Sequence, residues 1–259
     1  MPHRPEPSST PDPLAPVRNW HRLRADEADA VVVLDGFHAL KHALRFGAHV
    51  PVALTEDAGS VLDLADALAP DLTAPLRTLL DEVPPGTLGS LVPRAHPTGV
   101  AALAARAGAP AVPRSGVRTA PLVVLDDPRN LGNVGAVVRL AAGCGAAGVL
   151  TTGGTDPWHP AAVRAGAGLH FATAVARAEP DALPEGPLYA LDPEGDDLRG
   201  LDLPDGVLLA FGTERHGLSP ALRERADRLV SLPMEPLVSS YNLATSVAMA
   251  LYHWMSRRP

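Results

Sequence analysis

The feature that most constrains the fold of this chain is a repeated alternation between short apolar runs and segments with helical spacing of apolar residues. In the second half, the runs LVVLDD, GVLTTG and VLLAFG are separated by stretches long enough to hold a helix. Nearly continuous apolar runs of this length are typical of parallel strands that are buried on both faces. The alternation therefore predicts an α/β fold with a parallel sheet that helices cover on both sides.

The predicted elements divide the chain into two α/β regions. Strands are expected at residues 31–36, 50–57, 122–127, 148–153, 188–192, 207–212 and 228–233, and helices at 37–47, 60–69, 74–81, 99–107, 133–144 and 241–255. Residues 108–120 lack apolar periodicity and predict a linker. Frequent prolines near the N-terminus predict a disordered tail over residues 1–28. The two domains would then cover residues 29–107 and 121–259.

The charge balance limits how this chain could hold a nucleic acid. It has 22 basic and 29 acidic residues, a formal net charge of -7, and Lys41 is its only lysine. This balance argues against binding through bulk positive charge. A nucleic-acid site would therefore have to be a local basic one.

The sequence lacks the signatures of several other protein classes. The single cysteine, Cys144, excludes an internal disulfide and a CxxC zinc site, and it fits a reducing cytoplasm. No apolar run approaches the roughly 20 residues that span a bilayer. Neither region has a GxGxxG after its first strand, and no GxxxxGK[ST] or GxSxG occurs. His38 and His42 lie four residues apart without an obvious third ligand, so we expect a surface pair and no metal site.

Three loops stand out because each follows a predicted strand, at the sheet edge where open α/β sheets bind ligands. In the first loop, Asn133 is placed to cap the helix that follows. Arg139 lies opposite the apolar stripe of that helix, among small residues that would let another surface approach. A solvent-exposed arginine without a function is the alternative interpretation.

The second and third loops carry further candidates. Two glycines bracket Glu214, which suits either a close backbone approach to a ligand or an ordinary turn. Ser239 or Ser240 could cap the final helix, and Asn242 would lie in its first turn, where free N–H groups suit an anion. A plain capping serine beside an incidental asparagine is the alternative.

Taken together, the three loops resemble the motifs of the SpoU/TrmH branch of the SPOUT RNA methyltransferases. The family motifs have the forms N-x-G-x-x-x-R, G-x-E-x-x-G and P-M-x-G-x-x-x-S-L-N. The matching residues are Asn133, Gly135 and Arg139, then Gly212, Glu214 and Gly217, then Pro233, Met234, Ser240 and Asn242. Pro236 replaces the usual glycine of the third motif, and Tyr241 replaces the usual leucine. With a looser likeness in the first third, the resemblance covers about residues 30–257.

The resemblance implies a fold, a cofactor and an assembly. A SPOUT domain with a parallel sheet and a C-terminal trefoil knot would follow a small α/β/α substrate-binding domain. The protein would be a cytoplasmic homodimer that binds S-adenosylmethionine in the knot. The residues implied to hold this cofactor are Thr152, Gly153, Phe211, Gly212, Glu214, Gly217, Leu232, Met234, Asn242 and Leu243.

The resemblance also implies a reaction, the transfer of a methyl group from S-adenosylmethionine to a ribose 2′-hydroxyl of RNA. We favour 23S ribosomal RNA over tRNA as the substrate. The implied catalytic residues are Arg139, Asn133, Glu214, Ser240 and Asn242, and the implied RNA contacts are Arg139, Arg164 and Arg45. Two alternatives are a non-catalytic RNA-binding protein of the same fold and an unrelated nucleotide-binding α/β enzyme. The missing phosphate loop argues against the second.

Overall fold

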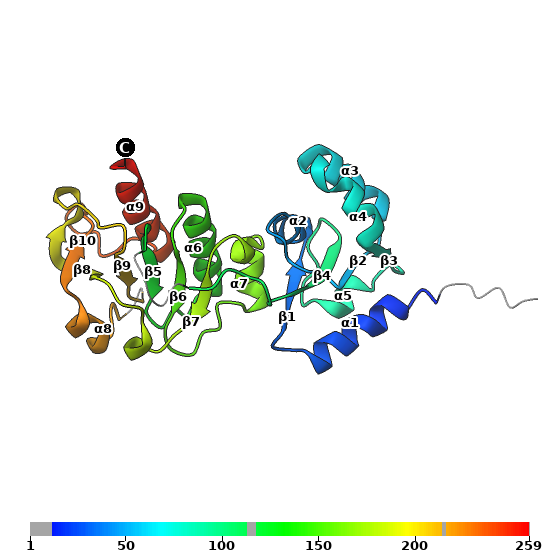
Figure 1. Cartoon of the computed structure of the whole chain (residues 1–259), viewed down its shortest axis with the longest axis horizontal. Helices are drawn as coiled ribbons and strands as arrows, with labels where there is room; N and C mark the ends of the chain where they lie inside the picture. Colours follow the sequence, from blue (N-terminus) through cyan, green and yellow to red (C-terminus); the bar gives the residue numbers. More distant parts are fainter. Residues whose placement is uncertain (1–11, 113–117, 214–215, 259) are drawn as a thin grey trace, which may run out of the picture.

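A computed structural model describes residues 12–112, 118–213 and 216–258. Two β-sheets, each with its own helices, lie side by side along the long axis of the molecule (Figure 1). The first sheet has four strands and the second has six. The predicted linker at 108–120 falls between the two sheets, and its residues 113–117 lie outside the described part of the chain. The domain boundaries themselves stay a prediction.

The N-terminal half is a three-layer arrangement. Its elements are α1 (Ala15–Asp26), β1 (Val31–Asp35), α2 (Phe37–Arg45), β2 (Val52–Thr55), α3 (Ala58–Leu68), α4 (Thr73–Leu79), β3 (Leu80–Glu82), α5 (Leu88–Leu91) and β4 (Val100–Ala105). The strand order is β1-β4-β2-β3, with β4 antiparallel to both of its neighbours. Helices α2, α3 and α4 contribute to the apolar core on one face of the sheet, and α1 and α5 contribute to the core on the other. The predicted α/β/α layering is confirmed.

The C-terminal half is built on a parallel sheet. Its elements are β5 (Leu122–Leu125), α6 (Leu131–Cys144), β6 (Gly148–Thr151), α7 (Pro160–Ala165), β7 (Val175–Arg177), β8 (Leu188–Asp197), β9 (Leu208–Phe211), α8 (Pro220–Arg225), β10 (Arg228–Ser231) and α9 (Leu243–Ser256). All pairings in the order β10-β8-β9-β5-β6-β7 are parallel. Helices α6, α7 and α9 pack on one face and α8 on the other. The sequence prediction of a buried parallel sheet is confirmed.

The prediction of a disordered tail over residues 1–28 is wrong for its second part. Helix α1 begins at Ala15 with a proline in its first turn, where the missing N–H of that residue is no loss. Trp20 and Leu23 of this helix are buried against the N-terminal sheet. The frequent prolines of the preceding segment suggested disorder, although the helix that follows carries a short apolar stripe. Residues 1–11 lie outside the described part.

The predicted helix at 99–107 is instead the strand β4, and this error has a clear cause. Its run VAALAA is rich in alanine, which favours helices in isolation. Residues 100–104 are all buried, because β4 is a central strand between β1 and β2. Burial on both sides outweighs the local preference. The helix predicted over 74–81 also ends early, because residues 80–82 pair with β2 as β3.

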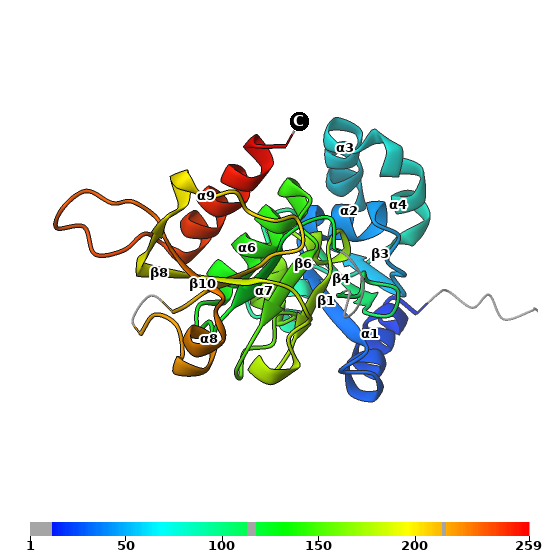
Figure 2. The same ribbon diagram turned by 60° about the vertical axis from the view of Figure 1, so that its left-hand side comes forward.

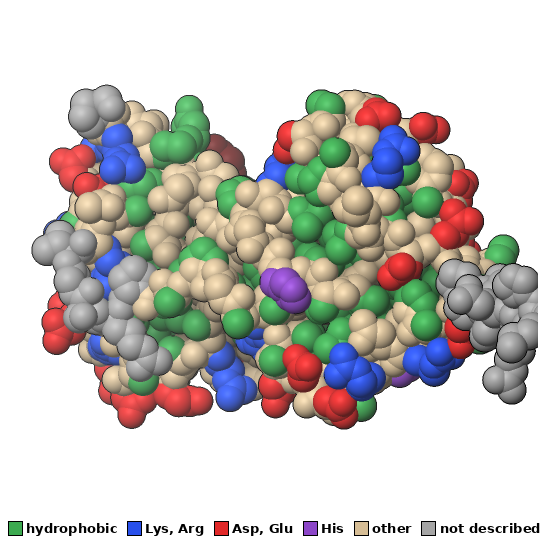
Figure 3. Space-filling model, turned by 45° about the vertical axis from the view of Figure 1, so that its right-hand side comes forward, with side chains coloured by type: hydrophobic (Ala, Val, Ile, Leu, Met, Phe, Trp, Pro, Cys, Tyr) green, Lys and Arg blue, Asp and Glu red, His purple; other side chains and the backbone are tan. Residues whose placement is uncertain are grey.

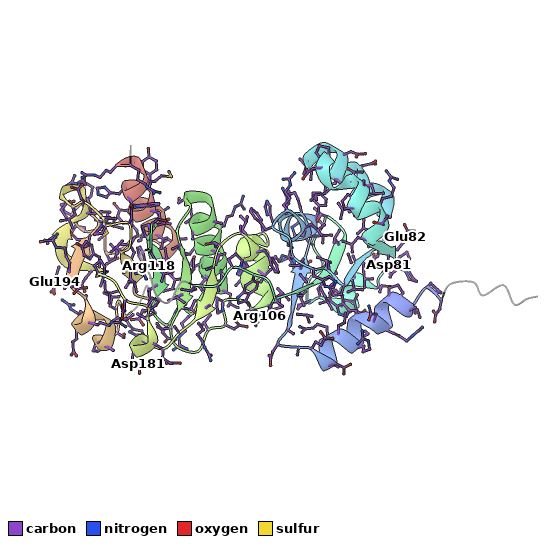
Figure 4. The ribbon with its side chains drawn as sticks, in the orientation of Figure 1. Asp81, Glu82, Arg106, Arg118, Asp181 and Glu194 are labelled. Carbon is purple, nitrogen blue, oxygen red and sulfur yellow. The ribbon has the colours of Figure 1, made fainter. Side chains whose placement is uncertain are left out.

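The two halves dock through specific contacts. His42 on α2 shares a 2.7 Å hydrogen bond with the carbonyl oxygen of Ala167, just beyond α7. A Cβ added at Gly168 would overlap the backbone of Ala39, so α2 approaches as closely as glycine allows. Arg106, which lies between the halves in Figure 4, stacks over the Trp158 ring at 5.2 Å from its centroid. The halves therefore meet at a packed interface.

A long loop joins the last strand to the last helix. The segment between β10 and α9 reaches outward from the body of the molecule (orange in Figure 2). It exposes the apolar side chains of Leu237 and Val238, and Leu237 has a positive φ of 73°. The loop then returns to start α9 beside α6. It contains the third motif, and its base lies at the carboxyl edge of the parallel sheet.

Candidate functional site

A pocket opens at the edge of the parallel sheet, beside β8, β9 and β10, and has a volume of about 240 Å³. It is lined by Leu191, Asp192, Pro193, Phe211, Gly212, Thr213, Gly217, Val230, Leu232, Met234, Ser239, Ser240, Tyr241, Leu243 and Ser246. The lining comes from β8, β9 and β10, the loop after β9, the loop before α9 and the first turn of α9. We call this the edge pocket. It lies where open parallel sheets bind ligands.

Most of the predicted cofactor residues meet in the edge pocket. Those that line it are Phe211, Gly212, Gly217, Leu232, Met234 and Leu243, together with the predicted catalytic Ser240. Thr152, Gly153 and Asn242 do not line it. Glu214 lies outside the described residues, so its predicted role stays a prediction. The second and third motifs, which are separated in sequence, thus form one wall and one rim of a single pocket.

The loop after β9 is held in a tight reversal by its two motif glycines. Thr213 and Gly217 exchange backbone hydrogen bonds of 2.9 and 3.0 Å. A Cβ added at Gly212 would overlap the carbonyl group of Gly217, and Gly217 has a φ of +64°. Both positions therefore require glycine for the loop to close. The G-x-E-x-x-G spacing is explained by this geometry.

A buried carboxylate ties the neighbouring loops together. Asp126, at the end of β5, accepts a 2.8 Å hydrogen bond from the Thr152 hydroxyl and a 2.6 Å bond from the Ser219 backbone N–H. The Thr152 hydroxyl in turn accepts from the backbone N–H of Asp127. Thr152 is thus occupied in holding the sheet edge rather than in lining the pocket. The sequence pattern did not indicate this role for Asp126.

The first and third motifs touch through two asparagines. The Asn242 side-chain amide donates a 3.2 Å hydrogen bond to the side-chain oxygen of Asn133. Asn242 also caps α9, since its side-chain oxygen accepts from the N–H groups of Ala244 and Thr245. The predicted cap at Ser239 or Ser240 is therefore wrong.

The prediction that Asn133 caps α6 is also wrong. Asn130 caps α6, and its side-chain oxygen accepts from the N–H groups of Gly132 and Asn133 at 2.9 and 3.2 Å. Two asparagines three residues apart offer the same local capping signal, and the sequence could not choose between them. Because Asn133 lies inside the first turn, its side chain can face Asn242.

Arg139 lies farther along α6, away from the edge pocket. Six residues separate it from Asn133, which is roughly 9 Å of helix. Gly135, one turn earlier on the same side, packs against α7 so closely that a Cβ would overlap the Ala162 carbonyl. Arg139 therefore extends beyond α7 into a second hollow, which lies between the two halves of the molecule. The expected close approach to this face of α6 is confirmed, and α7 is the element that makes it.

The second hollow has a volume of about 400 Å³, and we call it the interdomain cleft. It is lined by Asp35, Gly36, His38, Ala39, Lys41, His42, His96, Arg139, Arg164, Ala165 and Ala167. These residues come from β1, α2, the loop before β4, α6 and α7. The space-filling view shows a notch between the two halves (Figure 3).

The other two predicted RNA contacts have partners within the protein. Arg164 lines the cleft but forms an ion pair with Asp35, whose side chain is buried, and donates a 2.5 Å hydrogen bond to the Arg94 carbonyl. Arg45 makes two hydrogen bonds to Asp71 on the surface, at 3.0 and 2.5 Å. Asp71 raises the pKa of Arg45 through the hydrogen bond it accepts. The geometry thus favours structural roles for these two arginines, with Arg164 joining the halves.

Sequence reasoning missed part of the edge pocket. Asp192 lines it and is held by a 2.9 Å ion pair with Arg223. Asp192 ends the apolar run LYALD, so the rule that selected the other loops would also have selected this residue. Tyr241, which departs from the family pattern, donates a 3.0 Å hydrogen bond from its hydroxyl to the Pro233 carbonyl. The substitution therefore adds a contact across the base of the loop.

Metal sites and membrane-spanning helices are both absent from the described residues. Among the residues that the structure describes, no group of three or more His, Cys, Asp or Glu side chains is arranged to hold a metal ion. Within the same described ranges, none of the helices has the length and apolarity to cross a membrane.

Comparison with known proteins assigns the fold and motifs to a family. Residues 120–252 match the model of the SpoU rRNA Methylase family. The chain belongs to the SpoU rRNA methylase family. The match contains all three motifs, the whole parallel sheet and all of α9 except its end. The SpoU/TrmH resemblance of the sequence is confirmed.

Individual relatives agree with this assignment. The chain is 32% identical over 150 residues to a 23S rRNA (uridine(2479)-2′-O)-methyltransferase of Streptomyces viridochromogenes, a match that covers 52% of each chain. The chain thus matches about half the length of that relative. An uncharacterized tRNA/rRNA methyltransferase of Synechocystis is 27% identical over 95% of this chain and 91% of its own.

A solved structure extends the likeness to both halves. The SpoU methyltransferase AviRb from Streptomyces viridochromogenes, crystallised with AdoMet, superposes with a TM-score of 0.74 at 25% identity. This match covers 94% of the present chain and 97% of the other. The arrangement of both sheets is therefore shared.

Proposed function

We propose that this protein transfers a methyl group from S-adenosylmethionine to a ribose 2′-hydroxyl of RNA. One observation carries the proposal. The second and third motifs line a single pocket at the sheet edge, and the Asn242–Asn133 hydrogen bond joins that pocket to the helix that bears Arg139. A cofactor site and a basic residue for the substrate are thereby mounted on one framework.

The edge pocket fits the chemistry of this cofactor. Leu232, Met234 and Leu243 supply apolar surface for a flat base. Hydroxyl groups of Ser239, Ser240 and Ser246 and the exposed backbone of the glycine loop supply polar partners. A mostly apolar pocket with a few convergent polar groups is typical of small-molecule sites. When bound, S-adenosylmethionine supplies a methyl group made electrophilic by its sulfonium centre.

The protein's own residues would position the substrate. A guanidinium stays protonated at physiological pH, so Arg139 suits a clamp on an RNA phosphate better than a base. Asn133, Ser240 and Asn242 would orient the ribose and the cofactor, and Glu214 would order its loop. Holding the 2′-oxygen in line with the transferred methyl group accounts for much of the rate enhancement expected of such a site.

A second copy of the chain would complete the site. Arg139 does not line the edge pocket of its own chain, and it faces the interdomain cleft instead. In a homodimer, Arg139 of one copy can approach the edge pocket of the other. Exposed apolar side chains at Leu237, Val238, Tyr252 and Met255 support such an interface. We also expect the long loop before α9 to complete the trefoil knot of the family.

Ribosomal RNA is the substrate we favour. The Streptomyces viridochromogenes relative is a 23S rRNA 2′-O-methyltransferase, and so is a 32% identical relative from Streptomyces azureus. The N-terminal α/β/α half would bind the RNA around the target nucleotide. We place the enzyme in the cytoplasm, which fits its single cysteine.

The test combines binding and transfer. Calorimetry should show binding of S-adenosylmethionine, and labelled cofactor should methylate unmodified 23S rRNA in preference to tRNA. Mapping of the labelled nucleotide should place the methyl group on a ribose 2′-oxygen. Preferential labelling of tRNA would replace the substrate assignment. Failure to bind the cofactor would favour a non-catalytic RNA-binding protein.

A further inference from the structure

The interdomain cleft holds charges that the fold does not neutralise. Asp35 and Arg164 form an ion pair on its floor. Two cations remain, Lys41 from α2 and Arg139 from α6, and neither makes an ion pair within the described ranges. The negative charge of Asp71 raises the pKa of Lys41, but this carboxylate already forms an ion pair with Arg45. The cleft therefore presents a local positive potential on a chain with a net charge of -7.

The surroundings of the cleft strengthen this local effect. On the face that Figure 3 shows, most of the visible acidic side chains lie near the outer margin. Burial lowers the pKa of Lys41, and the nearby Arg45 and Arg139 lower it further. An anion placed between Lys41 and Arg139 would remove that repulsion. The geometry thus favours a negatively charged occupant.

Three histidines complete the lining of the cleft. Burial lowers the pKa of His38, and Lys41, His96 and Arg139 add to the effect by charge repulsion. Burial also lowers the pKa of His42, where the hydrogen bond to a backbone carbonyl acts in the opposite direction. Both imidazoles therefore favour the neutral form more strongly than a free histidine does. They can gain a proton when an anion arrives.

Hydrogen bonds fix the tautomers of two of these histidines. The carbonyl of Ala167 can only accept, so His42 carries its proton on Nδ1 and keeps a lone pair on Nε2. Nδ1 of His96 accepts from the Thr98 backbone N–H at 3.2 Å and lies 2.8 Å from the Thr98 hydroxyl, which can also donate to it, so Nε2 of His96 carries a proton. His96 thus offers an N–H donor, and His42 offers a nitrogen that binds a proton.

We infer that the interdomain cleft binds a backbone phosphate of the substrate RNA between Lys41 and Arg139, with His38 and His42 beside it. This inference rests on the proposed function and extends it. It assigns a part of the RNA site to the N-terminal half and gives a role to the only lysine of the chain. The two cations come from different halves, so an RNA held there spans the interface between them.

The size of the cleft indicates a nucleotide unit rather than a bare ion. Its volume of about 400 Å³ exceeds that of the edge pocket at about 240 Å³. A free phosphate would occupy only part of this space. A phosphate with its flanking riboses would fill more of it and would extend from Arg139 towards the edge pocket of the second copy. The phosphate site and the methylated ribose would then belong to the same short stretch of RNA.

The first test removes one charge and reads the salt dependence of RNA binding. Each phosphate contact contributes about 0.7 to 0.9 to the slope of log affinity against log salt. Lys41→Gln should lower the slope by about that amount and weaken binding of an unmodified 23S rRNA transcript roughly tenfold. Lys41→Arg should restore most of the affinity. Binding of S-adenosylmethionine should not change, which also shows that the variant is folded.

The matched control is Arg77→Gln, which removes an exposed charge from α4 of the same half, away from the cleft. It should leave both the affinity and the slope within experimental error of the wild type. Equal behaviour of Lys41→Gln and Arg77→Gln would overturn the assignment of the cleft. That outcome differs from failure of the proposed function, in which the wild type neither binds S-adenosylmethionine nor methylates RNA.

The second test follows the histidines by NMR. The pKa values of His38 and His42 should rise when the RNA transcript binds, and His38→Gln and His42→Gln assign the two signals. RNA affinity should therefore increase as the pH falls from 8 to about 6. Inorganic phosphate alone is the competing probe. If it raises these pKa values as far as RNA does, while Lys41→Gln leaves RNA affinity unchanged, the cleft binds a free anion and the RNA assignment is wrong.

Discussion

The edge pocket and the interdomain cleft differ in how they are made. The edge pocket is formed by strands and loops of one sheet, and its walls are glycine backbone, apolar side chains, hydroxyl groups and the carboxylate of Asp192. The interdomain cleft is formed by helices of both halves, and its walls carry charged and imidazole side chains. The first suits a small cofactor and the second a polyanion. One helix connects them, with Asn133 near the pocket and Arg139 in the cleft.

The largest expected effect separates the two hollows by function. Arg139→Ala should reduce methyl transfer at least 100- to 1,000-fold, the range seen when a single charged or donor group is removed from a transition-state site. Cofactor affinity should stay within about twofold, because Arg139 does not line the edge pocket. Labelled-methyl transfer and calorimetry measure the two quantities. A large loss of cofactor affinity would show that the two hollows are not separate.

The converse change should damage the pocket and spare the cleft. Gly212→Ala places a methyl group where the Gly217 carbonyl lies, so the loop after β9 cannot close. We expect cofactor affinity to fall roughly 100-fold, equivalent to about 2.7 kcal/mol, while RNA affinity is kept. Gly143→Ala is the matched control, since nothing lies within 4 Å of the added carbon. Equal cofactor binding by both variants would contradict the role of the loop.

The buried His170 contrasts with His38 and His42, which line the interdomain cleft. Burial lowers the pKa of His170 from 6.5 to about 4. Its Nε2–H donates to the Pro157 carbonyl at 2.9 Å. Within the described residues, Nδ1 has no hydrogen-bond acceptor beside it, so a second ring proton there would have no partner. Between pH 6.5 and about 4 the unfolded chain therefore binds more protons than the folded one.

This difference in proton binding sets the direction of the pH effect. The contribution of His170 to the free energy of unfolding is fully present above pH 6.5. It decreases as the pH falls towards 4 and does not change further below that. The loss from this residue should be about 3 kcal/mol. Denaturant unfolding across this range measures it, and His170→Gln should flatten the profile. An unchanged slope in the variant would assign the acid sensitivity to other groups.

The smallest effect is expected at Arg45. Its pair with Asp71 is exposed and lies outside the cleft lining. Surface pairs of this kind contribute about 0 to 1 kcal/mol. Arg45→Gln should therefore change RNA affinity less than twofold, as measured beside Lys41→Gln on the neighbouring turn of α2. A tenfold loss of RNA affinity would show that Arg45 belongs to the RNA site and that this site extends beyond the cleft lining.

The sequence was informative where structure is local. The parallel sheet followed from apolar runs such as LVVLDD, and the three motif loops followed from their places after strands. These features indicated the loops that form the edge pocket, and the family resemblance implied most of its cofactor-binding residues. Glycine positions such as Gly212 can be recognised because a tight loop leaves them no alternative.

The remainder depends on contacts between distant segments. Lys41 and Arg139 are separated by 98 positions, and only docking of the two halves brings them to one cleft. The alanine-rich β4 becomes a strand because β1 and β2 enclose it. Asn130 rather than Asn133 caps α6, a choice that the local pattern left open. The cleft and the strand β4 thus depend on neighbours far away in the chain, whereas the cap of α6 is a choice between two local asparagines.

The contact at Gly168 has a consequence for the RNA. Because the backbone of Ala39 occupies the space of a side chain at this position, the joint between the halves has no room for even one added methyl group. A joint packed this tightly resists bending, so adaptation during recognition falls to the nucleic acid. We therefore expect RNA hairpin loops whose target nucleotide is already unstacked in solution to be modified fastest, and rigid duplexes to be poor substrates.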